Sequence, residues 1–253
     1  MNSPAPASQV PVAGRSHRNR NLLIAAIGAV VIAGIVGGGY GLWFILIGPS
    51  SPASVIAAFP SGAPVAAPAT LDGTWNVNTT LGSIDAGTSS FAGYRVQEQL
   101  VGVGGHTAVG RTPKISGSMT LTGAMVTNVQ MTADLTALKS DQDNRDNQLR
   151  RQAIETDLFP TATFKTTQPI DLGALPADGK VVSVNATGEF TLHGVTRTVT
   201  IALQAARQGG LIAVAGSLPI VFSDYSIQKP NSFSVLSVDD HGTMEFHLLF
   251  THA

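Results

Sequence analysis

Residues 188–204 read GEFTLHGVTRTVTIALQ, and the alternation within this stretch decides the class of fold. On its C-terminal side, Val199, Ile201 and Leu203 are separated by single small or polar residues. Successive side chains of a β-strand point to opposite faces, so this spacing is typical of a strand with one buried face. Residues 193–194 (His-Gly) interrupt the pattern with a glycine that suits a tight turn. The stretch therefore predicts an antiparallel hairpin.

The same alternation appears in other stretches beyond residue 70, such as Val129–Leu135 and Thr243–Thr251. Many short antiparallel strands leave exposed edges unless the sheet closes on itself, and a barrel of about eight strands encloses room for one ligand. Two sheets packed face to face would show the same period, so the pattern leaves both a barrel and a sandwich open. We expect residues 71–253 to form one mainly β domain of about eight antiparallel strands.

One stretch of this domain lacks the alternation. Ser140–Ile154 begins with Ser140 and Asp141, which are favourable N-caps, and carries basic residues in its second half, in keeping with the helix dipole. We expect one short helix here. Its charged side chains are interpreted as exposed and solvated rather than as a binding cluster; they are Asp141, Asp143, Arg145, Asp146, Arg150 and Arg151.

The N-terminal part has the composition of a membrane anchor. Leu22–Ile47 contains no charged residue, and about 20 helical residues are enough to cross the hydrocarbon core of a bilayer. Arg15, Arg18 and Arg20 precede this run and, by the positive-inside rule, place the N-terminus in the cytoplasm. We expect a single-pass transmembrane helix over residues 21–47 in the cell membrane, with the C-terminal domain in the extracytoplasmic part of a bacterial cell envelope. A cleaved signal peptide is the alternative, although its apolar core is usually only about 7–15 residues long.

Two further segments flank the expected anchor. Residues 1–20 are polar and predict a disordered cytoplasmic tail. Residues 48–70 read GPSSPASVIAAFPSGAPVAAPAT and contain five prolines. That composition favours an extended linker over a packed core.

The composition also excludes several classes of function. Charged residues make up 12% of the chain and the formal net charge is −1, so nothing favours a nucleic-acid partner. The chain has no cysteine, which excludes disulfides, thiolate metal sites and cysteine nucleophiles. The sequence contains no motif for nucleophilic catalysis, phosphate binding or zinc binding, and its histidines lack the spacing of metal ligands. We expect no enzyme activity, no catalytic residue, no metal and no cofactor.

Three motifs in a fixed order resemble the YceI-like family, whose members are lipocalin-like β-barrels. Arg145–Arg150 (RDNQLR) is similar to the Arg-Asp-x-x-Leu-basic helix start of that family, and Leu158–Phe164 (LFPTATF) is similar to its aromatic-Pro step and the strand that follows. Gly188–Arg197 is similar to its His-Gly hairpin. The resemblance covers about Leu71–Phe250. It implies a lipocalin-like barrel that holds an elongated apolar molecule, such as a polyisoprenoid.

The chain departs from the family pattern at several positions. Gln148 stands where the family usually has histidine, while Phe222 and Ser226 stand where it often has arginine and glycine. The early part, residues 84–109, matches loosely, with Phe91 as its best anchor. These departures affect which ligand the resemblance implies more than they affect the fold that it implies.

The alternation and the resemblance together predict which side chains face the barrel interior and contact a lipid. The lipid-binding candidates are Phe91, Met131, Leu135, Phe164, Phe190, Leu192, Val199, Ile201, Leu203, Met244, Phe246 and Leu248. We expect a membrane-anchored binding protein that holds an isoprenoid-type lipid for carriage, storage or sensing, with that lipid and the membrane as its partners. The alternative is an interaction or structural module of the envelope whose barrel is filled by its own side chains. The sequence does not indicate the oligomeric state.

Overall fold

The computed structural model describes residues 57–62, 65–100, 104–230 and 235–253. Within these ranges, no helix has both the length and the apolar character needed to cross a bilayer. The expected tail over residues 1–20 and the expected transmembrane helix over residues 21–47 lie outside the described residues, as does the part of the expected linker before Ala57.

Thirteen strands in the described part of the chain form one antiparallel sheet. The strands are β1 (Gly73–Asn78), β2 (Phe91–Leu100), β3 (Gly104–Thr112), β4 (Ile115–Thr122), β5 (Met125–Asp134), β6 (Lys139–Ser140), β7 (Thr161–Thr166), β8 (Ile170–Asp171), β9 (Val181–Leu192), β10 (Val195–Gln208), β11 (Leu211–Val221), β12 (Val235–Val238) and β13 (His241–His252). The helical elements are η1 (Leu135–Ala137), α2 (Asp143–Gln148), η2 (Leu149–Ala153) and η3 (Phe222–Tyr225).

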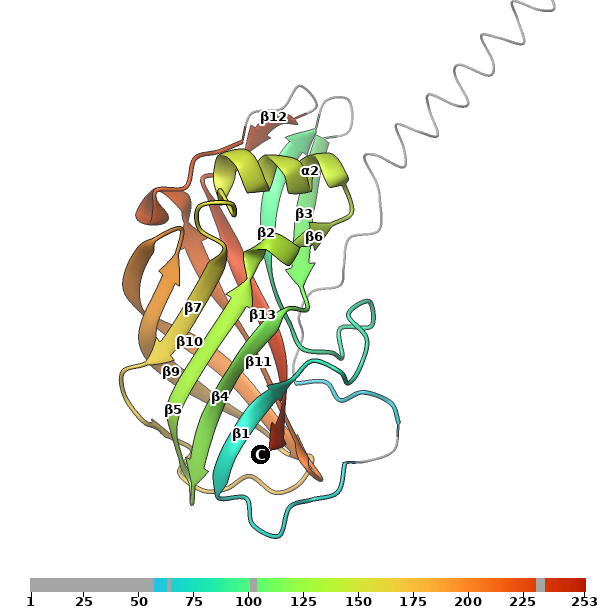
Figure 1. Cartoon of the computed structure of the whole chain (residues 1–253), viewed down its shortest axis with the longest axis vertical. Coiled ribbons are helices and arrows are strands. Elements are labelled where there is room, and N and C mark those ends of the chain that lie inside the picture. The colour runs from blue at the N-terminus through green and yellow to red at the C-terminus, as the bar shows by residue number, and fades with distance from the viewer. Residues whose placement is uncertain (1–56, 63–64, 101–103, 231–234) are drawn as a thin grey trace, which may run out of the picture. The chain divides into compact units, whose positions relative to one another are not determined.

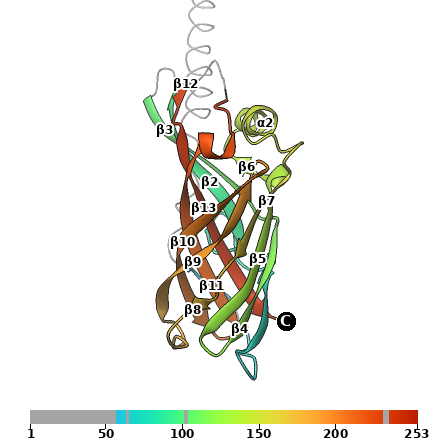
Figure 2. The same cartoon turned by 90° about the vertical axis from the view of Figure 1, so that its left-hand side faces the viewer.

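Eight of these strands close into a barrel. Their order is β1-β4-β5-β7-β9-β10-β11-β13, and β13 pairs with β1 to complete the ring, with Trp75 opposite His252. Figures 1 and 2 show these strands inclined around a common axis. The expected barrel is confirmed, and the sandwich alternative is wrong because the strands of the described residues belong to a single closed sheet.

The edge of β13 is shared between two partners. Its C-terminal part pairs with β1, and its N-terminal part, Thr243–His247, pairs with β2. Strands β2 and β3 therefore extend the sheet beyond the ring at one end of the barrel, where β12 pairs with the end of β2. Helix α2 lies at the same end (Figure 1), which we call the helix end; the opposite end is the far end.

The helical segment is less regular than expected. Helix α2 continues directly into η2, which is a π-helical turn. The N-cap of α2 is Gln142, which makes no side-chain cap, so the expected capping by Ser140 and Asp141 is wrong. Ser140 belongs to β6 instead, and its hydroxyl donates to the buried carboxylate of Asp146 at 2.7 Å. This bond, rather than a cap, fixes the start of the helix against the sheet.

The β9–β10 hairpin turns at His193 and Gly194, as expected. Both residues have positive φ, 51° and 73°, the combination that a type I′ turn requires. The buried ring of His193 is held on both sides: Nδ1 donates to the carbonyl oxygen of Tyr225 at 2.9 Å, and Nε2 lies 3.0 Å from Oε2 of Glu155. The turn thereby joins the hairpin to η3 and to the end of the helical segment.

Apolar side chains inside the barrel form two clusters. One contains Phe190 and Tyr225 and lies towards the helix end. The other contains Trp75 and Phe250 and lies towards the far end. Partly buried residues such as Phe246 pack against both clusters, so one apolar interior runs through the barrel.

Part of the expected linker packs on the outer face of the barrel. Residues 57–62 and 65–66, which we call the strap, include the buried Ala57. The backbone N–H of Ala58 lies 3.2 Å from Nε2 of His247 on β13. The described part of the expected linker therefore belongs to the folded domain, contrary to the expectation of an extended spacer.

The ring of His247 is buried between the strap and the segment before β2. Nδ1 of His247 lies 2.8 Å from the carbonyl oxygen of Ser89, while Nε2 lies 3.2 Å from the backbone nitrogen of Ala58 and 3.0 Å from its carbonyl oxygen. The pKa of His247 is lowered, mainly because burial disfavours the imidazolium form. The unfolded chain consequently binds this proton more tightly than the folded one.

This difference predicts a pH-dependent stability. The pKa of His247 is lower in the folded state than in the unfolded state, where it is about 6.5. Its contribution to the free energy of unfolding is therefore complete above about pH 6.5 and decreases as the pH falls below that value. Between about pH 7.5 and about pH 5 we expect the wild type to lose more free energy of unfolding than His247→Gln, because only the wild type has a buried imidazole to protonate. Urea unfolding at both pH values measures this. Equal pH dependence in the two proteins would contradict it.

Candidate functional site

The barrel interior contains a cavity of about 230 Å³. On β13 its lining residues run from Gly242 to Phe250, and this stretch of strand rises roughly 26 Å at about 3.3 Å per residue. The cavity therefore follows the barrel along much of its length. An apolar cavity of roughly 150 Å³ already stays dry and takes up a small hydrocarbon. The space inside this barrel suits an elongated apolar molecule.

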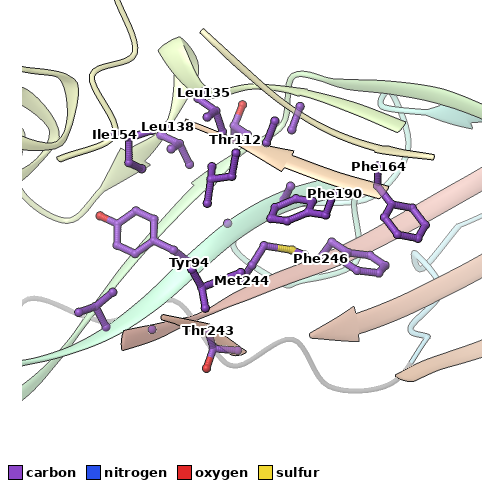
Figure 3. Close-up of a pocket in the computed structure, with 18 of the residues that line it drawn as sticks. Tyr94, Thr112, Leu135, Leu138, Ile154, Phe164, Phe190, Thr243, Met244 and Phe246 are labelled. Carbon is purple, nitrogen blue, oxygen red and sulfur yellow. The ribbon is translucent and has the colours of Figure 1, made fainter. Parts of the chain in front are cut away.

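Ten of the twelve residues expected to face inward line this cavity. They are Met131, Leu135, Phe164, Phe190, Leu192, Ile201, Leu203, Met244, Phe246 and Leu248. Most lie on strands at period-two positions, which turn their side chains to the same face. Figure 3 labels five of them, Leu135, Phe164, Phe190, Met244 and Phe246, around the same space. Their contact with a lipid stays a prediction.

Phe91 and Val199 are not among the lining residues. The ring of Phe91 stacks on His247, with ring centroids 6.0 Å apart, and lies 4.0 Å below the guanidinium of Arg111. His247 alternates along β13 with the inward-facing Phe246, so Phe91 is on the outer face and its inward assignment is wrong. It is fully buried there because the strap and the segment before β2 cover this face. Val199 packs against the apolar cluster at the helix end.

One end of the cavity is polar. Arg145 and Glu98 both line it at the helix end, and Nη2 of Arg145 donates to Oε1 of Glu98 at 2.6 Å. Nη1 of the same guanidinium donates to the carboxylate of Asp141. Nδ1 of His106 lies 3.1 Å from Oε1 of Glu98. The charge of Arg145 is therefore compensated within the protein.

This arrangement corrects the interpretation of the helix charges. Only 12% of the Arg145 side chain is exposed, and Asp146 is buried, so neither is a solvated surface charge. Asp143, Arg150 and Arg151 are exposed as expected. The difference arises because Arg145 and Gln148 of α2 line the cavity, so one face of the helix is turned towards the barrel interior.

Tyr94 adds a hydrogen-bond donor to the same end. Its hydroxyl is buried and has no hydrogen-bond partner among the described residues. Burial raises the pKa of this hydroxyl well above its usual range, so it stays protonated. The ring lies over Gly110, its cross-strand partner, where a Cβ atom would come within 2.4 Å of the ring. Figure 3 shows the Tyr94 ring beside apolar lining residues.

Strand β2 contributes lining residues that are not among the twelve candidates expected from the sequence. Ala92, Tyr94, Val96 and Glu98 all line the cavity, and their period-two spacing is visible in the sequence. The signal was obscured because this stretch mixes polar and apolar residues on the inward face and matches the family motifs only loosely. Glu98 in particular gives no sign in the sequence that Arg145, 47 positions later, will pair with it.

Most of the residues that line the cavity are apolar. Within the described ranges, no group of three or more histidine, aspartate or glutamate side chains is arranged to hold a metal ion. The charged members of the lining, Glu98 and Arg145, lie at the helix end, where the buried Tyr94 hydroxyl has no hydrogen-bond partner among the described residues.

Comparison with known families agrees with this geometry. The sequence model of the YceI-like domain matches residues 75–250. The chain belongs to the YceI-like domain family. The family-like motifs of this YceI-like chain meet at the helix end, where Phe159 of the aromatic-Pro step packs on His193 with ring centroids 4.3 Å apart. Ser226, where the family often has glycine, adopts a left-handed φ of 56°.

The curated relatives of this YceI-like chain are distant. A UPF0312 protein of Vibrio parahaemolyticus is 29% identical over 120 residues, which are 45% of this chain and 60% of that relative. A UPF0312 protein of Vibrio cholerae serotype O1 is 28% identical over 141 residues, which are 52% of this chain and 71% of that relative. The chain thus spans 60% of the length of the first of these relatives.

One solved structure shares the fold of this YceI-like barrel. A polyisoprenoid binding domain from Saccharophagus degradans, implicated in plant cell wall breakdown, superposes with a TM-score of 0.52 at 19% identity, covering 71% of this chain and 98% of that domain. At this level of identity, the likeness shows the architecture alone.

Proposed function

We propose that this YceI-like protein binds an elongated lipid of the isoprenoid type inside its barrel, outside the cytoplasm and tethered to the cell membrane. The observation that carries the proposal is the apolar cavity, which extends along the barrel. Burial of hydrocarbon gains roughly 0.8 kcal/mol per CH₂ group, so a long chain needs few polar contacts to bind tightly. The likeness to a polyisoprenoid binding domain supports the choice of an isoprenoid chain.

The cavity also bears on the alternative function. An interaction module with a barrel filled by its own side chains would leave no such space. Phe164, Phe246 and Met244 line the cavity instead of closing it. We therefore favour lipid binding over a purely structural role.

The polar end suggests the character of the lipid's head group. Arg145 already donates to two carboxylates, Glu98 and Asp141, and offers little uncompensated charge to an anion. Tyr94 has a protonated hydroxyl that can donate to an oxygen atom. These contacts favour an uncharged oxygen-bearing head group over a phosphate, because a buried anion needs a paired positive charge.

The expected transmembrane helix over residues 21–47 gives the proposal its location. A tether keeps the barrel near the membrane and raises its effective concentration for lipids that leave the bilayer. Carriage, storage and sensing of the lipid all agree with such an arrangement.

Native mass spectrometry of residues 48–253, purified from the natural host, tests the proposal. This part of the chain forms a compact unit by itself, and it must include the strap because Ala58 contacts His247. We expect a bound, hydrocarbon-rich molecule that dissociates as a neutral species. A protein that is consistently free of lipid, and takes up none when an isoprenoid alcohol is added, would overturn the proposal.

Tyr94→Phe provides a test of the polar end. Removing a buried hydroxyl that has no partner should leave the ligand-free protein as stable or raise its stability by about 1 kcal/mol. The same change should weaken the binding of a lipid with an oxygen-bearing head group about fivefold, the value of one hydrogen bond. Thermal unfolding and lipid titration measure the two effects. Unchanged affinity would place the head group elsewhere.

A further inference from the structure

The cavity stops short of the far end of the barrel. Strands β5, β9, β10 and β11 each continue for several residues beyond the last residue that lines the cavity; those last lining residues are Val129, Ala186, Leu203 and Val214. Strand β1, which pairs with the C-terminal part of β13 at this end, contributes no lining residue. The space inside the barrel therefore ends at a similar level on strands all around the ring.

Four apolar side chains fill the interior beyond that level. Trp75 of β1 lies opposite Met119 of β4, and Leu121, two residues further along β4, lies opposite Val126 of β5. All four belong to the apolar cluster at the far end, and none is more than 7% exposed. None of them lines the cavity. We call Trp75, Met119, Leu121 and Val126 the floor.

The indole of Trp75 is held firmly in the floor. Its N–H donates to the carbonyl oxygen of Leu71 at 2.9 Å. The ring of His252 packs edge-on against the indole, with ring centroids 5.2 Å apart, and Nε2 of His252 lies 3.1 Å from the carbonyl oxygen of Asp72. The indole cannot turn aside without losing a buried hydrogen bond and an aromatic contact. The floor is therefore a fixed boundary of the cavity.

The two ends of the cavity differ in polarity. Glu98, Arg145 and the buried hydroxyl of Tyr94 lie at the helix end. Next to the floor the lining is apolar, and its Ile170 pairs directly with Val126 of the floor. A polar group buried among apolar side chains without a partner is unfavourable. A lipid with one polar end consequently binds with its head group at the helix end and its tail directed at the floor.

The depth of the cavity corresponds to a definite tail length. The lining stretch of β13, Gly242–Phe250, rises roughly 26 Å along the strand. Strands of a closed barrel are inclined by about 35–45° to its axis, so the depth along the axis is about 20 Å. An extended chain advances about 1.2 Å per bond, as the peptide backbone does, so one isoprene unit occupies about 5 Å. The cavity accordingly takes about four extended units.

We propose that the floor limits the length of the lipid tail, so that this protein prefers an isoprenoid-type lipid whose tail has about four units. This inference rests on the proposed function, which places such a lipid in the cavity. A shorter tail leaves apolar lining without contact, and every buried CH₂ group adds to the affinity. A longer tail meets Met119 and Trp75, so its extra units stay in water and displace the head group from the helix end.

A series of isoprenoid alcohols that grow by one unit at a time tests the floor. Each alcohol is presented to the full-length protein from a cyclodextrin carrier, and its affinity is corrected for its measured binding to the carrier. For the wild type we expect the affinity to rise with each added unit up to about four units and then to stop rising. We call the length at which the rise stops the break.

Met119→Ala should move the break to longer tails by about one unit, because it removes a side chain from the floor. The ratio of variant affinity to wild-type affinity should be about tenfold larger for tails beyond the wild-type break than for shorter ones, the value of about two buried CH₂ groups. Met244→Ala is the matched control. It makes the same change in the lining towards the helix end and should alter the affinities for all lengths by a similar factor.

Val214→Phe changes the floor in the opposite direction. Val214 lines the cavity just before the floor and is only partly buried, so the larger ring enters empty space rather than the packed core. The break should move to tails shorter by about one unit, and the longest tails that the wild type accommodates should bind about tenfold more weakly. This variant decides the question even if Met119→Ala does not fold.

The outcomes separate this inference from the proposed function. A break at the same length in the wild type and both floor variants would overturn the role of the floor, and so would an affinity that keeps rising through the whole series. The alcohols still bind in both cases, so the proposed function stands. If alcohols of every length failed to bind to the wild type, the proposed function would be refuted together with the inference that rests on it.

Discussion

Replacing Phe246 by glutamate should abolish lipid binding and leave the barrel closed. Phe246 lines the cavity from β13, packs against both apolar clusters and lies next to Gly216 on β11. A ligand that fills the cavity would remove water from the new carboxylate, and an unpaired buried charge costs about 3–5 kcal/mol. The affinity should therefore fall by roughly 100-fold or more. Lipid titration and native mass spectrometry measure the loss.

The matched control places the same charge on the outer face. Thr200→Glu lies on β10, where Thr200 is exposed and pairs with Thr187. This variant should keep wild-type affinity, while Leu203→Asp, an inward change on the same strand, should behave like Phe246→Glu. If Phe246→Glu remained folded by circular dichroism and still carried lipid, the inward assignment of these positions would be wrong.

Trp75→Ala should cause the largest loss of stability. Trp75 is fully buried in β1, the strand that joins β4 to β13 and so closes the ring. Its indole N–H donates to the carbonyl oxygen of Leu71 at 2.9 Å. Truncation of a buried aromatic side chain leaves a cavity and typically costs about 3–5 kcal/mol, a large share of the roughly 5–15 kcal/mol of a whole domain. Urea unfolding measures the change.

Two further variants show whether the loss arises from the position of Trp75 in the barrel. Trp75→Phe keeps an aromatic ring but loses the bond to Leu71, so it should cost only about 1–2 kcal/mol. Leu175→Ala truncates an exposed apolar residue and should change stability by at most about 0.5 kcal/mol. A Trp75→Ala protein as stable as Trp75→Phe would show that β1 does not secure the closed ring.

Much of the fold follows from local sequence patterns. The alternation in residues 188–204 predicted the β9–β10 hairpin, and His193 with Gly194 marked its turn. The same period placed Met131 and Leu135 towards the interior. These features are predictable because strand geometry and turn geometry depend on residues that are close together in the chain.

The predictions for Phe91 and Arg145 are wrong because both side chains make contacts with residues far away in the chain. Phe91 is apolar and lies on a strand, but it is buried on the outer face by the strap and by His247, 156 positions later in the chain. Arg145 was interpreted as a surface charge because a helix with many charges is usually solvated. Its pairing with Glu98 depends on how α2 lies across β2.

The sequence by itself determined that residues beyond 70 form antiparallel strands with one apolar face, and its motifs indicated the family. Only the tertiary structure decided that the sheet closes through β1 and β13, that a cavity remains inside, and that Tyr94 and Arg145 meet at one end of it. The physical reason is that side-chain period is a property of each strand alone. Closure, empty volume and buried ion pairs instead depend on register and packing between segments far apart in the chain.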